Sequence, residues 1–183
     1  RVSRYPLPPP PPARSHAART RSPPPPLPPP ALACANRYAQ LYPEFSFVFI
    51  GDNGQGDVRA AELMVEKYGK TIEAVFIRRA QPVEKTPGFS DEIGRDAHLS
   101  QWRDQRIHFF DTYIGAAVQA LGLELIKPEG LFKVVRSSQQ MFLDLDSPST
   151  LEEWRATERR RTLLNRDTRE ARQVLRAKAV EAK

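Results

Sequence analysis

The sequence predicts an α/β fold built on a parallel sheet, and three observations support this prediction. An apolar run rich in aromatic and β-branched residues at 45–50 is followed by a glycine-rich acidic loop at 51–57. A helical pattern with one apolar side follows at 58–68, and a second apolar run occupies 71–77. Strand, loop, helix and strand in this order form a βαβ unit, and such units build parallel sheets.

The first element expected in the folded part is a short helix at 31–41. The chain continues with Tyr42-Pro43-Glu44, and this helix is expected to end there because the residue before a proline avoids the helical conformation. The run 45–50 lies between a proline and a glycine, which favours a buried strand. Asp57 is expected to cap the helix that follows the loop, and Gly69 to end it.

The second half of the chain predicts fewer strands and more helix. Residues 80–105 are polar, with scattered prolines and glycines, so we expect them to be irregular. A short third strand is predicted at 107–110. Asp111 or Thr112 is expected to cap the next helix, and Pro128-Glu129 to open another.

Composition divides the chain into three parts, 1–30, 31–147 and 148–183. The first is expected to be a disordered Pro-rich segment, because it holds 13 of the 18 prolines. The second is expected to be the folded domain, and it contains the acidic loop. The third is expected to be a charged C-terminal helix, solvated or loosely paired with a partner because its apolar residues are sparse.

Charge and hydropathy restrict the classes of function. The net charge is +6, and no acidic residue precedes Glu44, so both ends of the chain are basic. Such ends can meet an anionic membrane surface, or they can simply be solvated; no nucleic acid partner is expected. Mean hydropathy is −0.54, and no apolar run approaches the ~20 residues of a membrane-spanning helix. The lone Cys34 allows no internal disulfide and favours a reducing compartment, so a cytoplasmic protein, peripheral to membranes at most, is expected.

The Pro-rich segment contains Pro9, Pro12 and Arg14 in a PxxPxR pattern. Such patterns dock the aromatic grooves of SH3-like domains. A run of prolines almost always contains this spacing, so a simple linker remains the alternative.

The acidic loop, Gly51-Asp52-Asn53-Gly54-Gln55-Gly56-Asp57, carries the chemistry. Rossmann-like sheets place ligands at the carboxyl ends of their parallel strands, and this loop has that position. Its three glycines let the backbone come close to a ligand. Asp52, Asn53 and Asp57 offer hard oxygen atoms, which suit Mg²⁺.

Other interpretations of this loop fail on single residues. A P-loop needs a lysine where Asp57 stands, and an EF-hand needs an oxygen-bearing side chain where Gly54 stands. A tight polar turn without a ligand remains open.

The chain also resembles a known family, in several segments that occur in the family's order. These segments are Tyr42-Pro43-Glu44, Phe47 to Asp57, Val75-Phe76-Ile77, Phe109 to Ala117 and Gly130-Leu131. Over about 33–142 the chain resembles the C-terminal half of the catalytic domain of phosphatidate phosphatases of the fungal actin-patch type. That family belongs to the haloacid dehalogenase superfamily.

The resemblance implies a haloacid dehalogenase-type, Rossmann-like fold and a Mg²⁺-dependent hydrolase of lipid metabolism. Phosphatidate or another phosphomonoester is the implied substrate, and an aspartyl-phosphate the implied intermediate. In that family an aspartate attacks phosphorus, a second aspartate two residues on moves the proton, and a Ser or Thr and a Lys hold the phosphate. A GDxxxxD loop completes the metal site, and here it supplies Asp52 and Asp57.

The departures from the family pattern concern the catalytic residues. The DxDx[TV] nucleophile motif should lie upstream of the acidic loop, yet no acidic residue precedes Glu44 and no lysine precedes Lys67. We therefore expect a fragment that is inactive alone. Without the neighbouring nucleophile strand, the strand at 45–50 would have an unpaired apolar edge, so marginal stability or self-association is expected.

Two further hypotheses stay open at this stage. Asp144-Leu145-Asp146 imitates the missing motif, but its use would require a circular permutation; alternatively, Asp146 or Ser149 caps the helix that follows. The alternative function is a non-catalytic interaction protein that uses the Pro-rich segment and the basic helical tail.

Overall fold

The computed structural model describes residues 30–181, and the predictions made for the Pro-rich segment lie outside these residues. Two short 3-10 helices, at Gly69–Thr71 and Val83–Lys85, accompany the main elements. In chain order these elements are α1 (Pro30–Leu41), β1 (Phe47–Asp52), α2 (Asp57–Tyr68), β2 (Ile72–Arg78), α3 (Arg95–Asp104), β3 (Ile107–Phe110), α4 (Tyr113–Gly122), α5 (Pro128–Leu143) and α6 (Leu151–Glu181).

The described strands form one parallel sheet in the order β1-β2-β3. The carboxyl ends of β1 and β2 are aligned, because Asp52 lies opposite Arg78 in the register. The predicted α/β class and parallel sheet are confirmed. The finer assignment to a Rossmann-like, haloacid dehalogenase-type fold stays a prediction.

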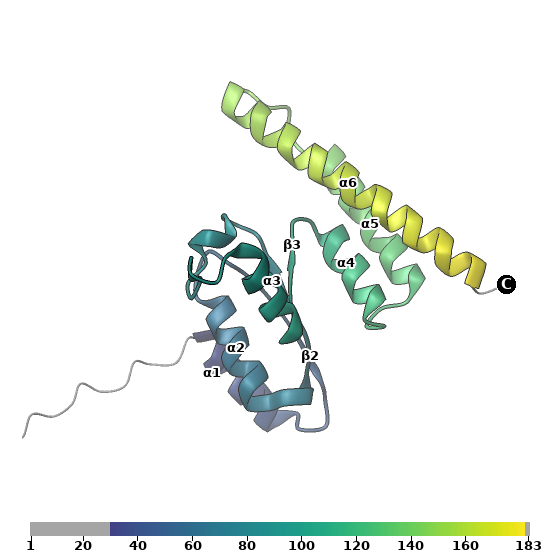
Figure 1. Ribbon diagram of the computed structural model, residues 1–183. Coiled ribbons are helices and arrows are strands. Elements are labelled where there is room, and N and C mark those ends of the chain that lie inside the picture. The colour runs from purple at the N-terminus through teal and green to yellow at the C-terminus, as the bar shows by residue number, and fades with distance from the viewer. Residues whose placement is uncertain (1–29, 182–183) are drawn as a thin grey trace, which may run out of the picture.

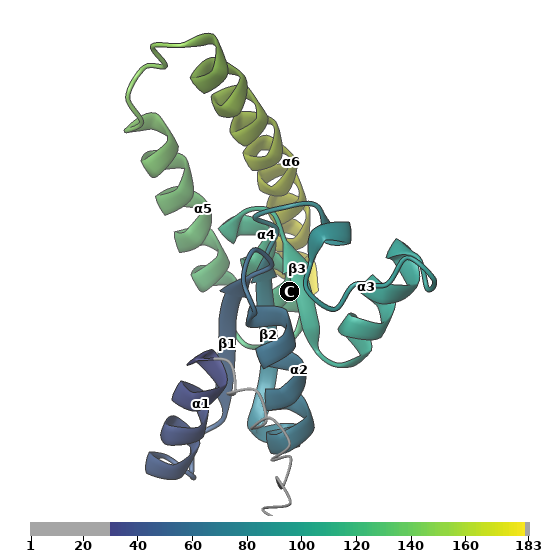
Figure 2. The same ribbon diagram turned by 90° about the vertical axis from the view of Figure 1, so that its left-hand side faces the viewer.

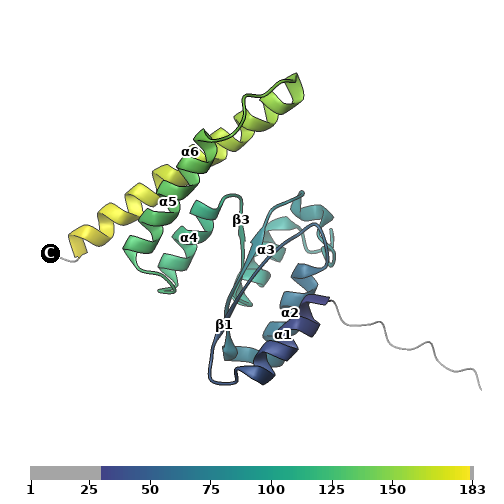
Figure 3. The same ribbon diagram turned by 180° about the vertical axis from the view of Figure 1, so that it is seen from behind.

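One face of the sheet is covered by α1, α2 and α3, and the main core lies beneath them (Figure 3). Alternate residues of each strand point to this face, as the two-residue period of a strand requires. The core contains Met64 from α2, Trp102 from α3, and Val75, Ile77 and Phe109 from the sheet. This core holds β1 and α2 in place at the two ends of the acidic loop.

The opposite face of the sheet is covered only in part. Ala74, Phe76 and Phe110 pack beneath Ala120 of α4. On β1 the residues of this face are Val48 and Ile50, which are 45% and 59% exposed. The prediction of a buried strand is therefore wrong for this face, because α4 reaches β2 and β3 and leaves β1 uncovered.

The outer edge of β1 is unpaired within residues 30–181, as predicted. Phe47 to Gly51 contains no charged side chain that would discourage pairing with another chain. We expect concentration-dependent self-association in sedimentation velocity, and we expect Ile50→Lys to weaken it. Val180→Lys, at a 75% exposed position on α6, is the control. A wild-type protein that stays monomeric at high concentration would contradict this prediction.

A second core joins α4, α5 and α6 beside the sheet (Figure 1). Ile114 and Leu121 of α4 pack against Leu131 of α5 and Ala171 of α6, and all four are buried. The expectation of a solvated or loosely paired tail is therefore wrong. Its few apolar residues recur at helical spacing on one face, and that face is enough to dock α6.

Residues 80–105 are not wholly irregular, because they contain α3. His98 and Trp102 lie one turn apart and form the buried side of this helix. His98 lies between Phe89 and Trp102, with ring centroids 4.8 Å and 5.1 Å away, and its Nε2 accepts a hydrogen bond from the Ser90 N–H. A histidine counts as polar in a hydropathy pattern, so the apolar side of this helix was missed.

The segment that imitates a nucleophile motif lies at a helix end and not at a strand end. Asp144 follows the last turn of α5 and accepts a hydrogen bond from Gln140 Nε2. Thr150 and Glu153 form the reciprocal cap of α6: the Glu153 N–H donates to Thr150 Oγ1 and the Thr150 N–H to Glu153 Oε2. The permutation hypothesis therefore lacks its strand, and the cap lies at Thr150 instead of Asp146 or Ser149.

Candidate functional site

The acidic loop joins the carboxyl end of β1 to the first turn of α2. Asp52 is the last residue of β1 and Asp57 the first residue of α2, and both side chains are partly buried. The loop between them, Asn53 to Gly56, is exposed except at Asn53. Both predicted metal ligands therefore lie at one end of the sheet, beside a helix N-terminus that favours negative charge.

The two carboxylates are oriented by backbone N–H groups. The Asp52 N–H donates to Asp57 Oδ2 at 3.1 Å, and the Gly54 N–H donates to Asp52 Oδ1 at 2.7 Å. The predicted role of Asp57 as a helix cap is wrong, since Gly56 has the N-cap position and Asp57 lies inside the helix. Its carboxylate turns back onto the strand end instead.

Gly51 makes room for this arrangement. A Cβ atom at Gly51 would lie 2.6 Å from Asp57 Oδ2 and 2.8 Å from its Cβ, which is closer than real Cβ atoms approach. The absence of a side chain therefore lets the Asp57 carboxylate rest against β1. This packing explains the first glycine of the loop.

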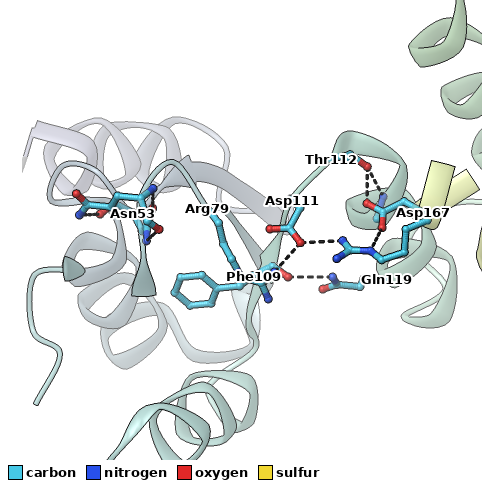
Figure 4. Close-up of polar contacts among 10 residues, drawn as sticks. Asn53, Arg79, Phe109, Asp111, Thr112, Gln119 and Asp167 are labelled. Carbon is cyan, nitrogen blue, oxygen red and sulfur yellow. Dashed lines mark hydrogen bonds and ion pairs between the residues drawn. The ribbon is translucent and has the colours of Figure 1, made fainter. Parts of the chain in front are cut away.

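Asn53 has a different role from the one predicted. Its side chain is fully buried and binds the segment after β2: Oδ1 accepts from the N–H groups of Ala80 and Gln81, and Nδ2 donates to Gln81 O and Thr86 Oγ1 (Figure 4). The hypothesis that Asn53 is a metal ligand is therefore wrong, because both polar atoms of its amide already form hydrogen bonds to the segment after β2.

The donor set suits Mg²⁺ with two protein ligands. One oxygen of each carboxylate is held by the loop, and the other has no hydrogen-bond partner within the described part of the chain. Mg²⁺ is commonly bound by one or two carboxylates together with phosphate oxygens and water. Within residues 30–181 no group of three or more His, Cys, Asp or Glu side chains could hold a metal ion, so the loop offers a pair.

A second polar cluster was not predicted, and it connects the sheet to α6 (Figure 4). Asp111 Oδ2 binds Arg79 Nη1 at 2.9 Å and Arg166 Nη2 at 2.7 Å. Arg166 Nε donates to Asp167 Oδ1, and Asp167 Oδ2 accepts from Thr112 Oγ1 at 2.6 Å. Thr112 in turn caps α4 by accepting from the Gly115 N–H, as one of the two predicted caps.

This cluster makes stability depend on pH. Burial alone would raise the pKa of Asp111, but hydrogen bonds from Arg166 and Arg79, together with their charges, hold this pKa below its ordinary value. The folded pKa lies below the unfolded one, so the stabilisation is present above the ordinary carboxyl pKa of about 4. It is lost as the pH falls through the folded pKa.

We expect the urea midpoint, followed by circular dichroism, to fall between pH 6 and pH 3 less steeply in Asp111→Asn than in the wild type. Asp146→Asn, at an exposed carboxyl, should keep the wild-type slope. Equal slopes for wild type and Asp111→Asn would show that this ion pair does not link folding to protons.

Comparison with known proteins supports the resemblance over part of the chain. Residues 33–79 match the family model described as "Phosphatidate phosphatase APP1, catalytic domain". The matched part contains the acidic loop and both strands beside it. No curated protein and no solved structure matches the chain. For residues 80–142 the resemblance stays a prediction.

Of the helices between residues 30 and 181, none has the length and apolar content to cross a bilayer.

Proposed function

We propose that this chain is phosphatidate phosphatase-like and that its acidic loop holds Mg²⁺ beside the phosphate of a phosphomonoester. The observation that carries this proposal is the Asp57 carboxylate, which rests on Gly51 and the Asp52 N–H at the carboxyl end of β1. This arrangement lies inside the segment that matches the phosphatase family. A phosphate bound there would lie at the carboxyl ends of the strands, where parallel α/β sheets usually bind their ligands.

The residues of the chain position the charges. Asp52 and Asp57 would each offer one carboxylate oxygen to the ion, and Asn53 would keep the loop in register with the segment after β2. When bound, Mg²⁺ would neutralise part of the phosphate charge. Arg78, exposed at the end of β2 and opposite Asp52, adds a second positive charge at this edge.

The proposal includes inactivity of this chain alone. Phosphoryl transfer to an enzyme needs a nucleophile and cations that hold the phosphate. Residues 1–43 contain no Asp or Glu, so they offer no counterpart of the family's upstream nucleophile motif. Asp144 and Asp146 follow a helix and do not replace it. We therefore propose that the chain binds Mg²⁺ and phosphate without turnover. The location that we propose is the cytoplasm, peripheral to membranes at most.

Metal binding tests the loop directly. We expect Mn²⁺, a paramagnetic substitute for Mg²⁺, to bind the wild type in a titration followed by electron paramagnetic resonance. Asp57→Asn should weaken binding at least about tenfold, since it removes one of two charged ligands. Asp104→Asn, at an exposed carboxyl on the end of α3, is the matched control. Equal binding by Asp57→Asn and the wild type would overturn the proposal.

Turnover tests the second part of the proposal. With phosphatidate and Mg²⁺ we expect no release of phosphate above the background of a reaction without protein. Robust release that Asp52→Asn abolishes would contradict inactivity and still support the loop. Release that Asp52→Asn leaves unchanged would count against both.

A further inference from the structure

A groove lies between the carboxyl ends of the strands and the hairpin formed by α5 and α6, and we call it the hairpin groove. Its volume is about 380 Å³. Arg78 and Phe110 border it at the ends of β2 and β3, and Phe142 and Leu163 line it from the hairpin. Figure 2 shows α5 and α6 extending beyond the carboxyl ends of the strands. These residues, apart from Arg78, lie outside the segment that matches the phosphatase family.

The walls of the hairpin groove are largely hydrocarbon. Tyr113, Met141 and Leu145 line it and are 61%, 69% and 46% exposed. Leu163 and Phe142 continue the same surface and are partly buried. Large apolar side chains gathered at one concave place indicate a ligand or a partner more often than isolated ones do.

The charge that remains available at the hairpin groove is positive. Arg78 and Arg160 border it, both are exposed, and neither has an ion pair among residues 30–181. Among the described residues that line the groove, Asp111 supplies the carboxylate, and Arg79 and Arg166 already bind it. An anionic group at this edge would therefore be attracted by two arginines. The carboxylate of Asp52, opposite Arg78 in the register, is the one that the proposed Mg²⁺ would neutralise.

The hairpin groove and the acidic loop share one edge of the sheet. Arg78 borders the groove and lies opposite Asp52 in the register of β1 and β2. A molecule that placed its phosphate at Arg78 would therefore have the loop on one side and the apolar walls on the other. The groove has the volume of a small-molecule site, and a protein partner would need a far larger contact area.

We propose that the hairpin groove binds the hydrocarbon chain of a long-chain phosphate monoester whose phosphate lies at Arg78. This inference rests on the proposed function, since it assigns the chain-length specificity of the same site. Each methylene buried in the groove should strengthen binding roughly two- to fourfold. A simple alkyl phosphate and a lipid with a phosphate headgroup share this chemistry. Comparing the affinities of decyl phosphate and lysophosphatidate would distinguish the two sources.

The two methionines of the chain allow a direct test. Met141 lines the hairpin groove, and Met64 is buried in the core beneath α2. In protein labelled with ¹³C at the methionine methyl groups, decyl phosphate below its micelle-forming concentration should shift the Met141 signal saturably and leave Met64 unchanged. Butyl phosphate should bind at least about 50-fold more weakly, because it lacks six methylenes. Equal affinity for both chains, or no shift of Met141, would overturn the inference.

Matched variants locate the hydrocarbon contact. By calorimetry without Mg²⁺, Met141→Asp should weaken decyl phosphate binding at least tenfold. Phe132→Asp changes a residue on the same helix, 59% exposed and outside the hairpin groove, and should bind as the wild type does. Arg78→Gln should weaken decyl phosphate but not decanol. If Phe132→Asp weakened binding as much as Met141→Asp, the groove would not be the site.

The failures of the two proposals are distinguishable. The Mn²⁺ titration and the decyl phosphate titration are separate measurements on the wild type, so each proposal can fail while the other holds. If the wild type bound no Mn²⁺ but still bound decyl phosphate more tightly than butyl phosphate, the proposed metal loop alone would be overturned. Intact Mn²⁺ binding without any chain-length preference would overturn the groove alone.

Discussion

Asn53→Ala is expected to lower the free energy of unfolding by about 2–4 kcal/mol, because the buried hydroxyl of Thr86 and three partly buried backbone groups lose their partner together. The amide of Asn53 binds the N–H groups of Ala80 and Gln81, the carbonyl oxygen of Gln81 and the hydroxyl of Thr86. Asn53 is fully buried and Thr86 is 4% exposed, so water cannot replace the bond between their side chains without opening the loop. Alanine also leaves a cavity where the amide was.

Urea unfolding followed by circular dichroism measures this loss. Gln55→Ala is the matched control, because Gln55 is exposed in the same loop and should change stability by less than about 0.5 kcal/mol. We also expect Asn53→Ala to weaken Mn²⁺ binding, since the loop that carries Asp52 and Asp57 loses its attachment to the segment after β2. A variant as stable as the wild type would show that this network contributes little.

The position of the acidic loop could be predicted from the sequence because it depends on local patterns. An apolar run, glycines and a helical pattern in this order place Asp52 and Asp57 at opposite ends of one turn. The direction of the Asn53 amide could not be predicted in this way. An asparagine beside two aspartates has the same sequence signal whether it binds a metal or the backbone of residues 28 positions away.

The docking of α6 depends on long-range packing, and this explains why it was missed. Asp167 lies in a strongly charged helix, and nothing nearby in the sequence distinguishes it from the exposed Glu170. Its partner Thr112 is 55 positions earlier in the chain. Only the contact of α6 with α4, at Gly115 and Ala171, brings the two side chains together.

Asp167→Ala is expected to destabilise the packing of α4, α5 and α6 by about 1.5–3 kcal/mol, because Thr112 loses a charged hydrogen-bond acceptor that is buried, whereas Arg166 is exposed and keeps Asp111. Asp167 is 2% exposed, and its oxygens hold Arg166 Nε and Thr112 Oγ1. Without this carboxylate, Thr112 loses the partner that orients its hydroxyl for the cap of α4, and α6 loses its bond to Thr112 while Arg166 still binds Asp111. A side chain on Gly115 would compete for the same space, since its Cβ would lie 2.9 Å from Asp167 Oδ2.

The two tryptophans allow the effect to be located. Trp102 is buried under the sheet, and Trp154 lies exposed near the start of α6. In Asp167→Ala, limited proteolysis should cut α6 faster than in the wild type, while the fluorescence of Trp102, measured in a Trp154→Phe background, keeps its folded value. Glu170→Ala, an exposed acid on the same helix, should resist proteolysis as the wild type does, and Asp167→Asn should lie between them because it keeps an oxygen for Thr112. If α6 of Asp167→Ala were as resistant as α6 of Glu170→Ala, apolar packing alone would hold the helix, and the buried carboxylate would not be what attaches it to the sheet unit.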